Sequence, residues 1–325
     1  MYFLIPKRAK QLWLLVASYY FYMSWNVKYV VLILFTTVLS YGCARLLEKY
    51  PAHKKLFLWL TVAACMSVLF FFKYYNFFDL TIVRILQKCA IPVQAHTLTL
   101  LLPVGISFYT FQALSYVIDV YRGEVPAQHN FWHMLLYISF FPQLIAGPIV
   151  KYRDIAAQIT GRKETIRKFA AGIMRFCWGL GKKVLLANSF ARVVDEIFKY
   201  GPYAVSRKAL WLGAILYMMQ IYYDFSGYSD MAIGLGKMFG FEFQENFNYP
   251  YTAGSVQEFW HRWHVSLSSW FRDYVYIPLG GNRKGAACTY RNLLIVFFLT
   301  GMWHGAGMAF ILWGLYHGLF LILER

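Results

Sequence analysis

Long apolar runs alternate with short polar loops along most of this chain. Several windows approach the roughly 20 residues that cross a bilayer as a helix. They lie at 11–25, 28–47, 56–73, 98–118, 131–150, 170–190, 209–236, 292–312 and 309–323. The first window is short, and the last two overlap, so they share residues or form a broken or re-entrant pair. The pattern predicts eight or nine membrane spans.

A different pattern occupies the long segment 240–291. Between Val256 and Tyr274 the apolar residues recur three or four positions apart, which predicts an amphipathic helix in or near a membrane interface. Trp260, His264, Leu267 and Phe271 follow the helical spacing i, i+4, i+7, i+11. We therefore expect the side chain of His264 to be buried with the apolar stripe.

Composition excludes a water-soluble globule, because 59% of the residues are hydrophobic and 14% are charged. Lipid admits helix bundles and closed barrels, and these apolar runs are too long for barrel strands. The sequence therefore predicts an all-α fold, a polytopic transmembrane helical bundle. No internal repeat or linker divides it, so residues 1–325 are expected to form a single membrane-embedded domain.

The formal net charge of +17 comes from Lys and Arg residues between the apolar runs, as in loops that face the cytoplasm. No nucleic-acid partner is expected. An alternative use of this charge is a landing surface for an acidic carrier protein or a phosphate-bearing donor. The five cysteines have no paired spacing, which indicates neither a disulfide framework nor a zinc site.

His304 is the first candidate for chemistry, because it lies inside an apolar run, where an ionisable side chain is costly. Histidine serves as a general base near neutral pH. The alternative is a core histidine that hydrogen-bonds between helices. Gly301 and Gly305 flank it four residues apart, a spacing that permits close helix approach.

His264 is the second candidate, and the alternative for it is an interfacial histidine satisfied locally by Ser266, Ser268 or Ser269. His261 and His264 are three residues apart, but no third ligand is apparent and HExxH is absent, so no metal site is expected. Motifs of serine hydrolases and nucleotide-binding loops are absent too.

A polar group interrupts the window 209–236, where Asp224, Ser226 and Asp230 lie among apolar residues. Buried carboxylates need ion-pair or hydrogen-bond partners. A structural polar network with Arg or Tyr partners is the favoured interpretation, and direct chemistry is the alternative.

Five motifs in one order resemble the membrane-bound O-acyltransferases, most closely the bacterial branch that includes alginate O-acetylation proteins and the related D-alanyl transfer proteins of teichoic acid modification. They are Leu102-Pro-Val-Gly-Ile-Ser-Phe-Tyr-Thr-Phe-Gln112, Phe141-Pro-Gln-Leu-Ile-Ala-Gly-Pro148, Tyr223-Asp-Phe-Ser-Gly-Tyr-Ser-Asp230, Phe259-Trp-His-Arg-Trp-His-Val-Ser-Leu-Ser-Ser-Trp-Phe-Arg-Asp-Tyr274 and Trp303-His-Gly305. In this resemblance His304 matches the essential histidine of the family, and His264 matches the second conserved histidine of this branch.

The resemblance implies a multi-pass protein of the bacterial plasma membrane that moves an acyl group, acetyl being favoured, from a cytoplasmic thioester to a hydroxyl outside. The donor would be acetyl-CoA or an acyl-phosphopantetheine carrier, with no tightly bound cofactor. The partners would be membrane lipids, an acyl carrier protein, and an extracytoplasmic polysaccharide or an SGNH-type acetyl relay protein.

Roles for the candidate residues follow from this activity. His304 would take the proton of the acceptor hydroxyl, and His264 would position the donor or stabilise the oxyanion. Four cations are candidates for binding the donor's phosphates, with loop charges that set topology as the alternative. They are Arg262, Arg272, Arg283 and Lys284.

Other functions remain open at this level: D-alanyl transfer, a non-enzymatic polysaccharide or lipid-carrier transporter, and a scaffold for a modifying complex. Family members usually carry further apolar segments before and after the part matched here. The chain is therefore expected to be incomplete at both termini.

Overall fold

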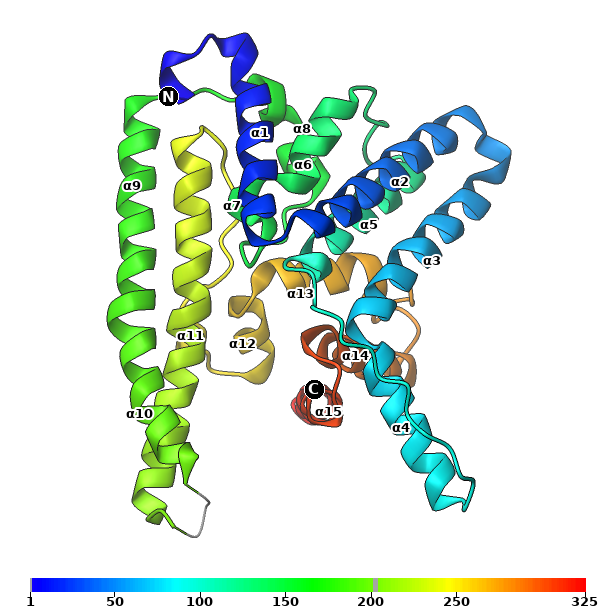
Figure 1. Cartoon of the computed structure of the whole chain (residues 1–325), viewed down its shortest axis with the longest axis vertical. Coiled ribbons are helices and arrows are strands. Elements are labelled where there is room, and N and C mark those ends of the chain that lie inside the picture. Colours follow the sequence, from blue (N-terminus) through cyan, green and yellow to red (C-terminus); the bar gives the residue numbers. More distant parts are fainter. Residues whose placement is uncertain (1, 201–203) are drawn as a thin grey trace.

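Helices form all the regular structure that the computed structural model describes, which covers residues 2–200 and 204–325 (Figure 1). The α-helices are α1 (Lys7–Trp25), α2 (Val30–Lys49), α3 (Lys54–Lys73), α4 (Tyr75–Lys88), α5 (Ile106–Arg122), α6 (Phe131–Ser139), α7 (Phe141–Leu144), α8 (Tyr152–Gly161), α9 (Ile166–Gly181), α10 (Asn188–Lys199), α11 (Arg207–Met238), α12 (Val256–Arg262), α13 (Val265–Phe271), α14 (Ala286–His304) and α15 (Met308–Leu323). Two π-helical turns, η4 (Lys182–Ala187) and η6 (Arg272–Tyr276), extend α9 and α13. The all-α prediction is confirmed.

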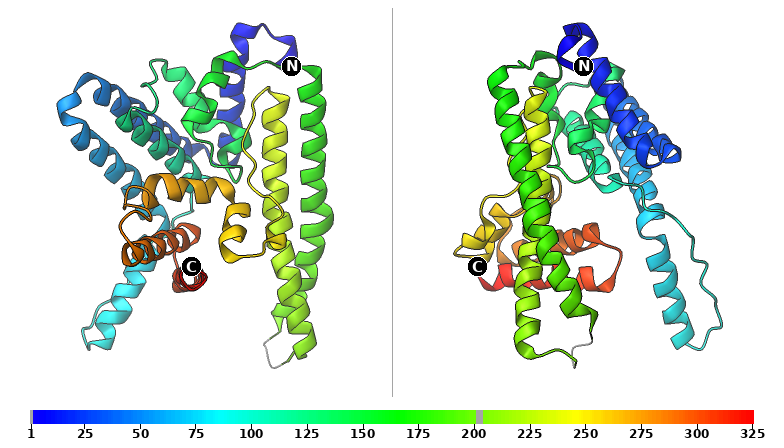
Figure 2. Two further views of the ribbon diagram at one scale, coloured as in Figure 1. Left: turned by 180° about the vertical axis from the view of Figure 1, so that it is seen from behind. Right: turned by 60° about the vertical axis from the view of Figure 1, so that its left-hand side comes forward.

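The long helices α9 and α11 lie side by side on one side of the molecule, and α2, α3 and α5 lie on the other (Figures 1 and 2). Between them, α12 and α13 cross the middle, next to the packed pair α14 and α15. One buried apolar cluster joins α5, α13 and α14 through Phe111, Leu267, Trp270 and Trp303. Phe111 and Trp270 stack with ring centroids 3.8 Å apart.

Among the described residues, three helical stretches are long and apolar enough to cross a membrane: Val27–Lys49, Pro51–Lys73 and Ala286–His304. Helix α15 is apolar but shorter. The prediction of eight or nine spans stays a prediction. Of the alternatives given for the last two windows, the structure has a broken pair, because α14 ends at His304 and α15 begins at Met308.

The window 131–150 is not one helix, and this part of the prediction is wrong. Helix α6 ends at Ser139, four residues of α7 follow, and residues 148–151 have no regular structure. Pro142 lies in the first turn of α7, where a backbone N–H has no helical partner and its absence costs nothing. In the interior of a continuous helix, proline would remove a backbone hydrogen bond. The buried segment after α7 therefore runs as irregular chain through the protein.

The expected single helix between Val256 and Tyr274 is broken at Trp263 and His264. His264 has a φ of 44°, in the left-handed region, and separates α12 from α13. Backbone bonds from residues 246–248 replace helical ones, since Val265 N donates to Asn246 O (2.9 Å) and Asn248 N donates to Arg262 O (2.9 Å). His264 is nevertheless 1% exposed, so the prediction of its burial is confirmed.

Glycines allow α9 and α11 to pack with backbone in contact. Gly172 lies against Gly234, and Gly179 lies against Gly227, so the pairs are seven residues apart on each helix. A Cβ added at Gly179 would lie 2.5 Å from the Gly227 carbonyl oxygen. Small residues at this spacing are typical of helix contacts in membrane proteins.

Replacing Gly179 by Ala is expected to destabilise the protein by about 1–3 kcal/mol, because the added methyl group has no space. Gly181→Ala is the matched control, since no neighbouring atom of the described residues lies within 4 Å of its added Cβ and alanine favours a helix. Thermal unfolding in detergent measures both variants. Equal melting temperatures for the two variants would contradict the close packing.

Candidate active site

His304 is the last residue of α14, and its position depends on the close pairing of α14 with α15. Gly301 of α14 faces Gly314 of α15, and a Cβ added at Gly314 would lie 3.1 Å from the Gly301 Cα. The His304 ring contacts Trp303 and Trp313, with ring centroids 5.1 Å from each in edge-to-face geometry. Of the two glycines noted in the sequence, Gly301 serves a close helix approach, whereas Gly305 lies beyond the end of α14 and faces the ring of Phe310.

His264 is held by a buried polar cluster centred on Asn246. The Asn246 Oδ1 atom lies 3.1 Å from His264 Nδ1 and accepts from Ser266 N (3.2 Å) and Ser266 Oγ (2.8 Å). The Asn246 Nδ2 atom donates to Ser229 Oγ of α11 at 2.9 Å. Asn246 thereby links α11, His264 and α13.

The two histidines, 40 positions apart in the sequence, line one cavity of about 590 Å³. This volume is within the range of small-molecule sites. Its polar lining comprises Gln257, His261, His264, Ser268, Ser269, Arg272, Tyr276, Asn282, Thr300, His304, Glu324 and Arg325, and its apolar walls include Trp260, Leu267, Phe271 and Phe297. Trp303 bridges the pair, since its ring centroid lies 5.8 Å from that of His264 and 5.1 Å from that of His304.

Comparison with known proteins assigns the chain to a family. A model of the membrane-bound O-acyltransferase family, MBOAT, matches residues 124–325, more than half of the chain. The chain belongs to the membrane-bound O-acyltransferase family. With its apolar helices, this membership makes it a membrane protein.

Several members of this family align with the chain. It is 46% identical to the probable alginate O-acetylase AlgI of Pseudomonas aeruginosa, over the whole chain and 62% of that protein. It is 39% identical to the peptidoglycan O-acetyltransferase of Helicobacter pylori, over the whole chain and 67% of that protein. The teichoic acid D-alanyltransferase of Bacillus subtilis is 29% identical over 67% of the chain and 58% of its own length. The chain thus spans about 62% of the first relative.

Buried ring nitrogens without partners gather around the cavity of this MBOAT chain. Among the described residues, His264 Nε2, Trp260 Nε1 and Trp303 Nε1 have no hydrogen-bond partner. Most buried polar atoms in proteins are paired, and unpaired ones at a site are available to a ligand. The indole N–H groups can only donate. Of the three residues, Trp260 and His264 line the cavity, so its wall holds an unpaired indole donor and an unpaired imidazole nitrogen.

Lys73 is a residue of this region that sequence reasoning missed. It ends α3, and its Nζ donates to the carbonyl oxygen of Trp303 and to Ser107 Oγ, the latter at 3.2 Å. The neighbouring Tyr74 donates its hydroxyl to Met302 O at 2.7 Å. The last carbonyls of a helix lack helical partners, so these two side chains cap α14 directly beside His304. A lone lysine that ends an apolar run was the available signal.

Of the four cations predicted to bind the donor, Arg272 is the one found among the described residues that line the cavity. Arg262 instead donates to Glu258 Oε1 (2.5 Å) and Thr252 Oγ1 (2.7 Å). Arg283 and Lys284 are exposed in the loop before α14. The structure thus does not bring these three to the histidine pair.

The predicted polar group on α11 faces α9 and η4. Asp230 accepts from Arg175 Nε (2.7 Å) and Lys182 Nζ (2.6 Å), and Asp224 pairs with Lys183. Ser226 Oγ is buried without a partner in the part of the chain that the structure describes. The carboxylates have the arginine partner that the sequence suggested and two lysines besides.

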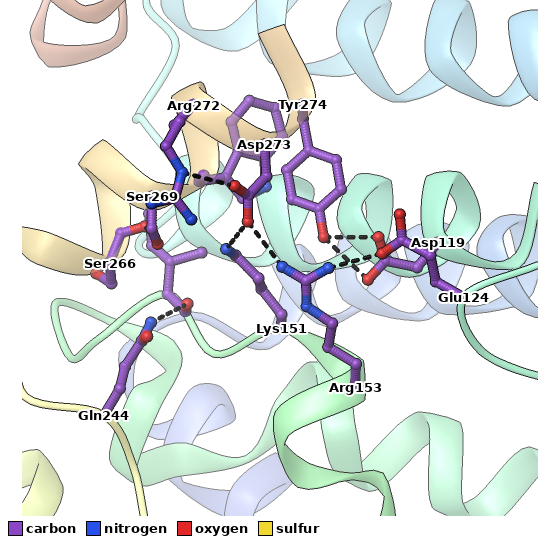
Figure 3. A network of polar contacts seen from close by, with 12 residues as sticks. Asp119, Glu124, Lys151, Arg153, Gln244, Ser266, Ser269, Arg272, Asp273 and Tyr274 are labelled. Carbon is purple, nitrogen blue, oxygen red and sulfur yellow. Dashed lines mark hydrogen bonds and ion pairs between the residues drawn. The ribbon is translucent and has the colours of Figure 1, made fainter. Parts of the chain in front are cut away.

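A charged network connects residues 272–274, next to the cavity, with α5 (Figure 3). Asp273 accepts from Lys151 Nζ (2.7 Å), Arg153 Nη2 (2.7 Å) and Arg272 Nε (2.9 Å). The Tyr274 hydroxyl donates to both carboxylate oxygens of Asp119, at 2.8 and 2.9 Å. Arg272, which lines the cavity, is therefore held by a network that reaches α5 and the segment after α7.

The charge of Asp273 should make stability depend on pH. Burial raises the pKa of the Asp273 carboxyl, but hydrogen bonds and charges of Lys151 and Arg272 more than reverse this, so its pKa lies below its ordinary value. A carboxyl whose pKa is lowered by folding stabilises the protein at any pH above its pKa in the unfolded chain, about 4. This stabilisation is lost as the pH falls through the pKa of the carboxyl in the folded protein.

We therefore expect the melting temperature of the wild type to fall more steeply below about pH 5 than that of Asp273→Asn, which is less stable at neutral pH. Thermal unfolding in detergent from pH 7 to pH 3 gives the difference between the two curves. Parallel curves would show that Asp273 does not carry this dependence.

Proposed function

We propose that this protein is an O-acyltransferase that moves an acyl group from a cytoplasmic thioester to a hydroxyl of an extracytoplasmic polysaccharide or relay protein. Acetyl is the favoured acyl group. The observation that supports it most is the meeting of His264 and His304 in one cavity of small-molecule size. The names of the relatives, which include an alginate O-acetylase and a peptidoglycan O-acetyltransferase, support a polysaccharide acceptor.

The transfer requires no covalent enzyme intermediate. The acceptor oxygen attacks the carbonyl carbon of the thioester, and its proton passes to an imidazole of the pair. The new C–O bond forms, the C–S bond breaks, and the leaving thiolate takes the proton from the imidazole. A thiolate is a good leaving group, so a positioned base and donors toward the carbonyl oxygen supply the catalysis. His264 and His304 are the proposed catalytic residues.

Donor binding is proposed at Arg272, whose side chain lines the cavity and can reach a phosphate of coenzyme A or phosphopantetheine. The donor is a substrate, and no tightly bound cofactor is proposed. Arg262, Arg283 and Lys284 would act at most on distal parts of a donor or on an acyl carrier protein. The proposed location is the bacterial plasma membrane, with several passes.

The test is acyl transfer in membranes that express the full-length protein, with [14C]acetyl-CoA and alginate or peptidoglycan oligosaccharides. The proposal is supported if the saccharide gains label only when the protein is present and if alkali, which hydrolyses esters, removes that label. A D-alanyl thioester in place of acetyl-CoA tests the second acyl group suggested by the D-alanyltransferase relative. Saccharide uptake without any ester would favour a transporter instead.

A further inference from the structure

The orientation of the Asn246 amide is fixed by a group that can only donate. The backbone N–H of Ser266 lies 3.2 Å from Asn246 Oδ1, so that atom is the carbonyl oxygen and not the amide nitrogen. The Ser266 hydroxyl donates to the same oxygen at 2.8 Å. On its other side the amide nitrogen donates to Ser229 Oγ. Asn246 is fully buried, so solvent does not compete for this amide.

This orientation determines which nitrogen of His264 carries the proton. His264 Nδ1 lies 3.1 Å from the Asn246 carbonyl oxygen, an acceptor, so Nδ1 must donate. Among the described residues no carboxylate bonds to the ring, and a buried charge without such a partner is costly, so the imidazole is neutral. Its other nitrogen, Nε2, then holds a lone pair.

Nothing in the described part of the protein uses that lone pair. Nε2 is buried and has no partner, while His264 lines the cavity. The left-handed backbone of His264, with a φ of 44°, is uncommon for residues other than glycine and is kept by the bonds to Asn246. The fold thus constrains both the place of the ring and its tautomer.

We propose that Asn246 is a positioning residue that holds His264 in the Nδ1–H tautomer, so that His264 Nε2 accepts the proton of the attacking hydroxyl. This inference rests on the proposed acyl transfer and names the base within it. It reverses the roles expected from sequence, because the one N–H of a neutral His264 in this tautomer is bonded to Asn246 and is not free for an oxyanion. A base oriented by a third group is the usual arrangement for activating a hydroxyl.

In this arrangement His304 faces the carbonyl oxygen of the thioester, while His264 faces the attacking hydroxyl. The Lys73 ammonium lies against the carbonyl of the preceding residue, so this side of the site is positively charged. An N–H of His304 beside a cation suits the carbonyl oxygen, which becomes negative as the hydroxyl attacks. The proton of the attacking hydroxyl thus passes to His264, and the negative charge on the carbonyl oxygen develops near His304.

The tautomer is tested without reference to activity. Solid-state 15N NMR of 15N-histidine-labelled protein, with the His264 signals identified by their loss in His264→Gln, reports whether Nε2 carries a proton. We expect an unprotonated Nε2 in the wild type and in Asn246→Asp, which keeps an acceptor oxygen, and a mixture of tautomers in Asn246→Leu. A protonated Nε2 in the wild type, or identical spectra for the aspartate and leucine variants, would overturn the role of Asn246.

Glutamine separates the two histidine roles, because its amide donates a hydrogen bond but is no base. With [14C]acetyl-CoA and full-length protein at equal abundance, we expect His304→Gln to retain about tenfold more transfer than His304→Ala. His264→Gln and His264→Ala should be equally inactive. Asn246→Leu should lower kcat about 10- to 100-fold with little change in KM, and Asn246→Asp should recover part of it.

Rescue by glutamine at His264 and not at His304 would overturn the assignment of the base. Absence of transfer by the wild type would count against the proposed function. The NMR result would still decide the tautomer in that case, so the two failures are distinguishable.

Discussion

Replacing either histidine of the cavity by alanine is expected to reduce acyl transfer about 10²- to 10⁴-fold, the usual contribution of a positioned acid or base. His264 and His304 line the same cavity and both contact Trp303. When two residues act as one unit, the effects of their substitutions on the rate do not add. The double variant should therefore be only slightly slower than the slower single variant. The effect should appear in kcat, since neither change removes the apolar walls that hold the donor.

The measurement is the initial rate of label transfer from [14C]acetyl-CoA, with protein abundance matched by immunoblot. His261→Ala is the matched control, because His261 also lines the cavity but is exposed and lies on α12, outside the cluster around Asn246. A rate for His304→Ala within threefold of the wild type would remove His304 from the chemistry.

The second large effect is expected at Lys73. Lys73→Met removes the donor to the Trp303 carbonyl and the positive charge beside His304. A hydrogen bond from a charged group contributes about 1.5–3 kcal/mol, so transfer should fall about 10- to 100-fold, and the melting temperature should fall with it. Lys73→Arg keeps the charge and should recover part of the rate.

Lys55→Met controls for loss of a lysine from the same helix, since Lys55 is exposed near the start of α3. Transfer rates per folded protein separate the catalytic part of the Lys73 effect from lost stability. Unchanged transfer by Lys73→Met, at equal folded protein, would contradict a part for this cation in the site.

The features that the sequence predicted well depend on local patterns. Apolar runs without alternation predicted the all-α fold, and the apolar spacing around His264 predicted that it is buried, although the single helix assumed for that spacing is broken there. The overlap of the last two apolar windows left a broken pair as one alternative, and the break between α14 and α15 agrees with it. The motif order led to the family that the comparison confirms.

Contacts between distant segments account for what the sequence did not predict. The break at His264 arises from hydrogen bonds to Asn246 and Asn248, which lie 18 and 16 residues before it and which no periodicity reveals. Lys73 approaches Trp303 from 230 positions away. The glycine pairs of α9 and α11 had a readable signal, a spacing of seven on both helices, and could have been used to place those helices side by side.

The central claim is that this cavity transfers an acyl group to a saccharide hydroxyl. Its most direct measurement is ester formation from [14C]acetyl-CoA on alginate or peptidoglycan oligosaccharides by the full-length wild type and by the His264→Ala, His304→Ala double variant, at equal abundance in the membrane. The account predicts alkali-labile label on the saccharide with the wild type and background label with the double variant. Equal labelling by both proteins would contradict it.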